Sequence, residues 1–238
     1  TRELLGLATA SALVPLNSTM IAVALTDVAD DFGIRSGSAG ILVTIYLVMM
    51  LVGQPALGRV VDLVGARRAL HWALIGFIGA SAAASFAGTF PLLVIGRAAQ
   101  AVFGAALTPS SQALLRSLTE PAQRGRSFGL LGSFIGAGAA AGPVIGGLVT
   151  QFGGWRGIFM INVPIAAAAL WAVANLKTLP TNRVKVPGAP GLTHVLTRRA
   201  FGAAFVTQAM TTLGQYSLLL AVPVVLDGRG WSSTQVGV

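Results

Sequence analysis

One arginine lies within a long apolar part of the sequence. Arg97 is the only Lys, Arg, Asp or Glu between Ala69 and Leu115. A cation at membrane depth costs at least ~2.5 kcal/mol, so such a residue normally faces a cavity or a polar partner. Gln100 follows about one helical turn later, on nearly the same face. We predict that Arg97 and Gln100 carry the chemistry of a buried cavity. The alternative is an arginine that snorkels or bonds to backbone carbonyls.

Further polar side chains occur in other apolar stretches. Asn17 and Tyr46 lie in the N-terminal part of the sequence, and Gln208, Gln215 and Tyr216 lie in the C-terminal part. Each can line a cavity or satisfy a neighbouring helix, and the residue types alone do not decide between these roles. We take Asn17 as a ligand-contacting group and Tyr46 and Gln208 as candidates for the same pathway.

Few residues are available for catalytic or cofactor chemistry. The sequence has no cysteine, which excludes disulfides, thiolate metal sites and cysteine nucleophiles. The two histidines, His71 and His194, lie far apart. Lysine occurs only at positions 177 and 185, so the phosphate-binding sequence GxxxxGK[ST] cannot be written. We expect no enzyme activity, no metal and no cofactor.

The elements that must position these residues are membrane helices. Of 238 residues, 54% are hydrophobic and 10% are charged, whereas a soluble domain carries roughly 25% charged residues. About 20 apolar residues are needed to cross a bilayer, and seven uncharged stretches reach a comparable length. The predicted spans are Leu4–Leu25, Ala39–Leu57, Ala69–Phe86, Phe90–Leu107, Phe128–Val149, Gly157–Leu176 and Phe201–Leu226.

The basic residues predict the topology. With a cytoplasmic N-terminus, the inner segments hold twelve Lys and Arg residues and the outer loops hold three, Arg97 being buried. The net charge of +9 therefore follows from membrane orientation, and we expect no nucleic-acid partner.

The spans divide the sequence into three parts. We predict a six-helix bundle over 1–176, a cytoplasmic linker rich in Pro and Gly over 177–199, and the truncated start of a second bundle over 200–238. This layout is typical of transporters built from two related halves. Because the sequence starts without Met and ends after a turn-like segment, we expect it to be a piece of a longer protein.

The loop between the second and third spans carries a specific motif. Gly58, Asp62, Gly65, Arg67 and Arg68 are spaced as in the GxLaDxxGrRxxl loop, and the stretch resembles that loop of the major facilitator superfamily. The two glycines permit tight backbone, the carboxylate can cap a helix or pair with arginine, and the arginines stay in the cytoplasm. The resemblance implies a cytoplasmic gate. The alternative is ordinary positive-inside anchoring.

Two further elements resemble the same superfamily. The stretch from Arg97 to Gly104 is similar to its RxxqGxg element, with Ala101 in place of a glycine, and implies a role in proton coupling. The fifth span resembles the gxxxGPxxGG element of its antiporters, which implies export. Close helix packing alone would also explain these small residues. The residues of the antiporter element are Gly138, Gly142, Pro143, Gly146 and Gly147.

The first and sixth spans are similar to drug:proton antiporters of the DHA2 type. The stretch from Trp155 to Pro164 resembles their WRWiFxINvP sequence, and the stretch from Leu16 to Leu25 resembles LDxTivNVAL. Asn17 replaces the acid of the latter pattern and cannot titrate, so a proton-carrying carboxylate would lie in the missing half or among the acids at span ends. The 23-residue linker cannot hold the two extra helices of fourteen-span members, so the protein has twelve spans or this sequence lacks them.

Together these patterns predict an all-α membrane protein with the major facilitator fold. The resemblance implies a monomeric secondary transporter in the cytoplasmic membrane that exports drugs or small molecules in exchange for protons. The expected partners are a small-molecule substrate, protons and the lipid bilayer. An uncoupled exporter of a neutral or anionic metabolite, and a non-transporting scaffold or sensor, remain as alternatives.

Overall fold

The computed structural model describes residues 2–174 and the isolated positions 199, 202–203, 206–207, 210 and 214. The chain divides into two compact units, Thr1–Thr181 and Asn182–Val238. Everything below concerns the first unit. Apart from those isolated positions, the predicted linker and the predicted seventh span lie outside the described residues, and so does the candidate Gln208.

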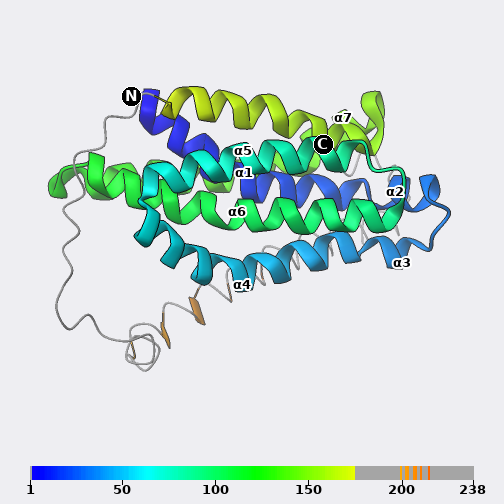
Figure 1. The fold of residues 1–238 in the computed structure, drawn as a ribbon, viewed down its shortest axis with the longest axis horizontal. Coiled ribbons are helices and arrows are strands. Elements are labelled where there is room, and N and C mark those ends of the chain that lie inside the picture. The colour runs from blue at the N-terminus through cyan, green and yellow to red at the C-terminus, as the bar shows by residue number, and fades with distance from the viewer. Residues whose placement is uncertain are drawn as a thin grey trace. The chain divides into compact units, whose positions relative to one another are not determined.

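The described part of the chain contains helices and no strands (Figure 1). Long helices run along one direction of the bundle, and the short α2 and α3 lie together at one end of it. The elements are α1 (Arg2–Val23), α2 (Leu25–Asp31), α3 (Ser36–Ala39), α4 (Ile41–Val64), α5 (Ala66–Ser85), α6 (Phe90–Leu118), a 3₁₀ turn (Pro121–Gln123) and α7 (Arg124–Val173).

The helix labelled α7 consists of two arms joined at Gly154. This residue has φ 64° and ψ −179°, which is not a helical conformation. A backbone in this region is essentially open only to glycine. The chain reverses here, and the two arms, residues 124–153 and 155–173, run as separate helices (Figure 1). They correspond to the fifth and sixth predicted spans.

Four helical stretches of the described chain are long and apolar enough to cross a membrane, and α7 alone accounts for two crossings. The helices α4 and α6 continue to Val64 and Leu118, beyond the predicted ends at Leu57 and Leu107. The reason is that hydropathy marks only the part of a helix that lies in hydrocarbon, whereas backbone hydrogen bonds continue into the polar interface. The stretches are Arg2–Val23, Ser36–Val64, Phe90–Leu118 and Pro121–Val173.

The first helix occupies the centre of the bundle. Most of α1 is buried, whereas few residues of α4 and α7 are buried. α1 packs mainly on α7, while α6 packs on α4 and α5. Apolar side chains form clusters toward the two ends of the bundle, so polar groups placed between them are shielded from both aqueous sides.

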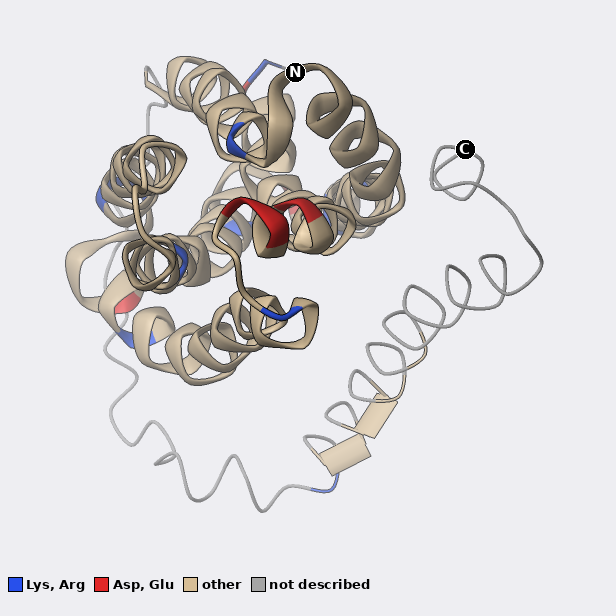
Figure 2. Ribbon diagram, turned by 90° about the vertical axis from the view of Figure 1, so that its right-hand side faces the viewer, with Lys and Arg blue, Asp and Glu red and all other residues tan. Residues whose placement is uncertain are grey.

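Charged residues lie mostly at the helix ends. Figure 2 looks onto the end of the bundle that carries α2 and α3, where the ribbon of a short helix is coloured red for acidic residues. The sequence places Asp27, Asp30 and Asp31 on α2. Glu3 lies in the first turn of α1 and Asp62 near the end of α4. The described acids therefore occupy the ends of helices, as a membrane-embedded bundle requires.

Candidate functional site

Arg97 lies in the interior of the bundle. It stands on α6 with no solvent exposure, although its side chain is the largest of the fully buried ones. Its Nη1 donates to the Oε1 of Gln100 at 2.6 Å, and its Nε donates to the carbonyl of Leu42 on α4 at 3.4 Å. The guanidinium also lies 4.3 Å from the ring centre of Tyr46 and 5.7 Å from that of Phe159. These contacts hold a permanent cation at membrane depth.

Gln100 connects Arg97 to two other helices. Its Oε1 also accepts a hydrogen bond from the Nδ2 of Asn17 at 3.0 Å. Its Nε2 donates to the hydroxyl of Ser81 on α5 at 2.7 Å. Every polar atom of this fully buried amide therefore has a protein partner, so the side chain is fixed in one orientation.

Asn17 extends the network to the second arm of α7. Its Oδ1 accepts a hydrogen bond from the Nδ2 of Asn162 at 2.9 Å, and the same nitrogen donates to the carbonyl of Ile158 at 3.0 Å. Asn17 thus donates on one side and accepts on the other, which an amide can do and a carboxylate cannot. Both asparagines are fully buried. The Oδ1 of Asn162 is buried and has no partner among the described residues.

Tyr46 closes the network on the α4 side. Its ring lies against the Arg97 guanidinium, and its hydroxyl donates to the carbonyl of Val14 on α1 at 3.3 Å. Only 1% of Tyr46 is exposed. The ring therefore links α4, α6 and α1, and it stabilises the buried cation through its π face.

The structure brings four of the predicted site residues together: Asn17, Tyr46, Arg97 and Gln100. The sequence analysis missed two members of the network, Ser81 and Asn162. Asn162 carried a usable signal, because it is an amide in the middle of an apolar span. Ser81 carried none, because serine is common in helices of this kind.

The network holds a fixed positive charge and neutral hydrogen-bonding groups. A guanidinium is charged in proteins, and amides, serine hydroxyls and phenols are neutral at physiological pH. The described acids lie at helix ends and not among these groups. Chemically, the network can orient a polar ligand and attract negative charge, and its neutral members cannot carry a proton.

The loop motif from Gly58 to Arg68, which is predicted to form a gate and is called the gate loop below, contains one position where glycine is required. Gly65 joins α4 to α5 with φ 90°, a conformation that other residues rarely adopt. Gly58 differs from the expectation of tight backbone, because it lies inside α4 and a Cβ there would meet nothing within 4 Å. Of the two glycines of this motif, only Gly65 is thus required by the local backbone conformation.

The charged members of the gate loop have different surroundings. Asp62 is exposed in the last turn of α4, where it makes no ion pair within the described part of the chain. The carbonyl end of a helix repels an acid, so α4 does not favour this residue here. Arg67 is half-buried and its Nη2 donates to the carbonyl of Ala174, at the end of α7, at 2.9 Å. Arg68 is exposed.

The antiporter element packs one face against α1. A Cβ at Gly138 would lie 2.8 Å from the carbonyl oxygen of Ala12, and one at Gly146 would lie 2.8 Å from that of Met20. At Gly142 a Cβ would collide with the Thr19 side chain. A Cβ at Gly147, in contrast, would meet nothing within 4 Å. Pro143, the remaining residue of this element, lies inside α7.

An ion pair that was not predicted from the sequence joins segments at the end of the bundle that carries α2. The Nη1 of Arg156 lies 2.8 Å from the Oδ2 of Asp31 on α2, and the Trp155 indole donates to the same oxygen at 3.1 Å. Arg156 also donates to the carbonyl of Ala87 at 3.4 Å. The hydrogen bonds from Arg156 and then Trp155 lower the pKa of Asp31. This group connects α2, the α5–α6 loop and the second arm of α7.

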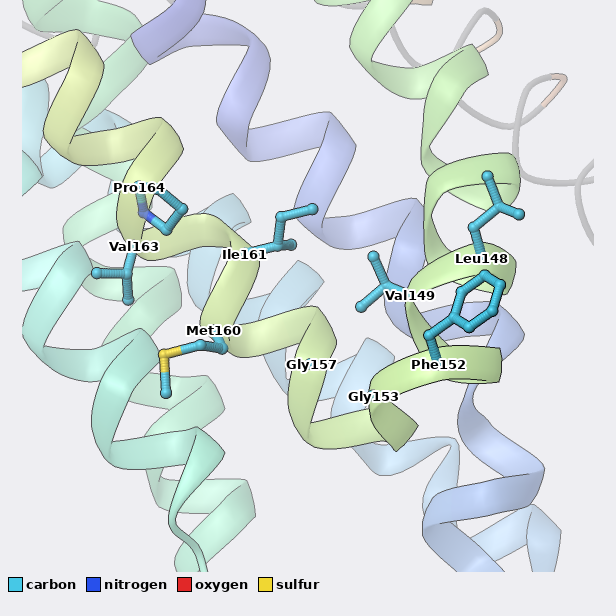
Figure 3. Close-up of a pocket in the computed structure, with 9 residues that line it drawn as sticks. All are labelled: Leu148, Val149, Phe152, Gly153, Gly157, Met160, Ile161, Val163 and Pro164. Carbon is cyan, nitrogen blue, oxygen red and sulfur yellow. The ribbon is translucent and has the colours of Figure 1, made fainter.

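An apolar groove lies between the two arms of α7 (Figure 3). Its volume is about 540 Å³, and Phe152, Met160 and Ile161 are among its lining side chains. Every lining residue is apolar or glycine. The groove therefore has no group that could recognise a polar ligand, and it is separate from the Arg97 network.

Apolar membrane helices gathered around a buried arginine–amide network define a helical membrane bundle of the kind found in transporters. The profile of the Major Facilitator Superfamily matches residues 7–238 of this sequence. The chain belongs to that superfamily, which confirms the predicted family and fold class.

Known relatives include resistance and export proteins. The puromycin resistance protein of Streptomyces alboniger is 37% identical over 179 residues, which cover 73% of this chain and 34% of that protein. The tetracenomycin C resistance and export protein of Streptomyces glaucescens is 34% identical over 182 residues, covering 76% and 34% respectively. The chain thus spans about a third of the length of these relatives.

Solved structures support the fold. A bacterial homologue of the human lysosomal transporter Spinster superposes with a TM-score of 0.78 at 17% identity, over 99% of this chain and 57% of that one. At this level of identity the similarity concerns the fold alone.

Proposed function

We propose that the whole protein is a secondary active transporter that exports drugs or other small molecules across the cytoplasmic membrane. The buried network of Arg97, Gln100 and Asn17 is the observation that carries this proposal. Burying a cation and several amides at membrane depth is costly, and a purely structural bundle could use apolar residues there. Relatives named for antibiotic resistance and export support the direction of transport.

The gate loop supports movement between two states. Asp62 is exposed at a helix end whose dipole does not favour an acid, and the first bundle offers it no ion pair among the described residues. A cationic partner that is present in one state and absent in the other would satisfy this carboxylate in the first state only. The excess of Lys and Arg on one side supports a cytoplasmic position of this loop and of the N-terminus.

Proton coupling is the finer part of the proposal. Asn17 and the other amides of the network cannot carry a proton, whereas Arg97 can change the proton affinity of a carboxylate brought close to it. We infer that the carboxylate belongs to the second bundle or to the acids at the helix ends. Substrate and proton would then compete for binding next to the fixed positive charge of Arg97.

The test uses the full-length protein in everted vesicles with an imposed proton gradient. Lipophilic cationic, neutral and anionic compounds are added in turn, and substrate-dependent collapse of the gradient is measured. Arg97→Ala is compared with Arg116→Ala, which removes an exposed arginine near the end of α6. We expect collapse in the wild type and in Arg116→Ala, and its loss in Arg97→Ala.

One observation favours a second candidate, an uncoupled exporter of neutral or anionic metabolites. The described network is positive and contains Asn17 where the similar antiporters have an acid, so it offers nothing to attract a cation. Substrate movement without collapse of the gradient would support this candidate. Absence of movement for all compounds would contradict transport and favour a scaffold or sensor with the same fold.

A further inference from the structure

A second groove lies where α1 begins and the second arm of α7 ends. Its volume is about 280 Å³, and its walls include Leu5 and Gly6 of α1 and Ala168 and Ala172 of α7. A Cβ at Gly6 would lie 2.7 Å from that of Ala172, so the two helices touch at the floor of the groove. Figure 1 shows the start of α1 beside the yellow-green end of α7.

A cation and an aromatic ring stand at the end of this groove. The Nη2 of Arg2 donates to the carbonyl of Trp171 at 2.8 Å, and its guanidinium lies 3.5 Å from the centre of the indole ring. An arginine has five N–H donors in one plane. Stacking uses the face of the group and the carbonyl takes one donor, so the edge of the guanidinium retains donors for another acceptor. The Trp171 residue is 67% exposed.

The position of these groups points to the membrane interface. Tryptophan rings and arginines at the ends of membrane helices lie at the level of the lipid headgroups. The guanidinium fork matches the oxygens of a phosphate. The groove itself is apolar except for Thr9 and Arg2, and residues of both α1 and α7 line it.

We propose that this groove binds one anionic glycerophospholipid. The phosphate contacts the Arg2 guanidinium, the Trp171 ring covers the glycerol region, and one acyl chain lies between α1 and α7. The positive-inside rule places the site in the cytoplasmic leaflet. The proposal depends on membrane embedding and not on transport, so failure of the transport test leaves it intact.

The test is lipid titration of the purified full-length protein in a neutral detergent. Phosphatidylglycerol with brominated acyl chains quenches indole fluorescence on contact, and the Trp171→Phe variant identifies the part of the signal that comes from this site. Arg2→Gln should weaken binding at least about fivefold, the ratio expected for one arginine near an anionic headgroup. Ala168→Phe should fill the groove and abolish the Trp171 quenching. Arg116→Gln, the matched control, should bind as the wild type does.

Four results would overturn the proposal. Equal affinity for brominated phosphatidylcholine would show that the anionic headgroup is not recognised. Equal weakening by Arg2→Gln and Arg116→Gln would indicate diffuse attraction to the surface. Unchanged binding in Ala168→Phe would exclude the groove. Competition by glycerol phosphate at the affinity of the whole lipid would show that the acyl chain contributes nothing.

Discussion

Gly146 and Gly147 are neighbours in the sequence with opposite surroundings. A Cβ at Gly146 would lie 2.8 Å from the carbonyl oxygen and 2.9 Å from the Cα of Met20 on α1, whereas a Cβ at Gly147 would meet nothing within 4 Å. The atoms near Gly146 belong to the backbone, so no side-chain rotation can relieve the contact. Substitution of each glycine by alanine therefore tests the packing of the antiporter element on α1.

The magnitude follows from two effects. Alanine in place of glycine gains about 1 kcal/mol of helix propensity, and both variants share this gain. An added methyl group in a packed interface costs about 1–3 kcal/mol, and only Gly146→Ala carries this cost. We expect Gly147→Ala to be as stable as the wild type or more so, and Gly146→Ala to be about 1–3 kcal/mol less stable than Gly147→Ala.

The assay is thermal unfolding of the two full-length variants in the same detergent. For 150–250 residues, 1 kcal/mol shifts Tm by about 2–4 °C, and the shift is smaller for a longer protein, so the two variants are measured side by side under one set of conditions. Met20→Ala should not rescue Gly146→Ala, because the contacting atoms are backbone. Equal Tm values for Gly146→Ala and Gly147→Ala would refute the contact between this face of α7 and α1.

Other substitutions test the buried network around Asn17, the break in α7 at Gly154 and the ion pair between Asp31 and Arg156. Asn17→Leu removes one hydrogen bond each from Gln100 and Asn162, whose atoms keep Arg97 and the carbonyl of Ile158 as partners. It should therefore destabilise the fold by about 0.5–1.5 kcal/mol per lost hydrogen bond, as measured by thermal unfolding against the surface variant Arg116→Ala. Asn17→Asp adds a titratable group to the network and should change the pH dependence of transport relative to the wild type, and identical pH profiles would contradict a place for residue 17 in the pathway. Gly154→Ala should cost about 1–3 kcal/mol because its φ of 64° with ψ −179° excludes other residues, whereas Gly153→Ala, one residue earlier, should cost little. The folded-state pKa of Asp31 is lower than its unfolded value, so its contribution to stability is present above the unfolded pKa and is lost as pH falls through the folded one. Unfolding of Asp31→Asn should therefore depend less on pH below about pH 4 than that of the wild type, and parallel profiles would count against the ion pair with Arg156.

The sequence by itself determined the class of this protein and the position of its central cation. The membrane sets a length and a composition for each crossing helix, and both can be read directly from uncharged stretches. The same rule makes Arg97 conspicuous, because a charge inside such a stretch has few explanations. The place of Gln100 beside Arg97 was predicted from their helical spacing alone.

Only the tertiary structure decided which residues meet across helices. Lipid and protein interior are both apolar, so hydrophobic periodicity does not show which face of a membrane helix points inward. For that reason the sequence could not show that Gly138, Gly142 and Gly146 pack on α1, or place Ser81 and Asn162 beside Gln100 and Asn17. The rotation and register of each helix, which side-chain packing sets, assemble the network and join Asp31 to Arg156, 125 residues away in the sequence.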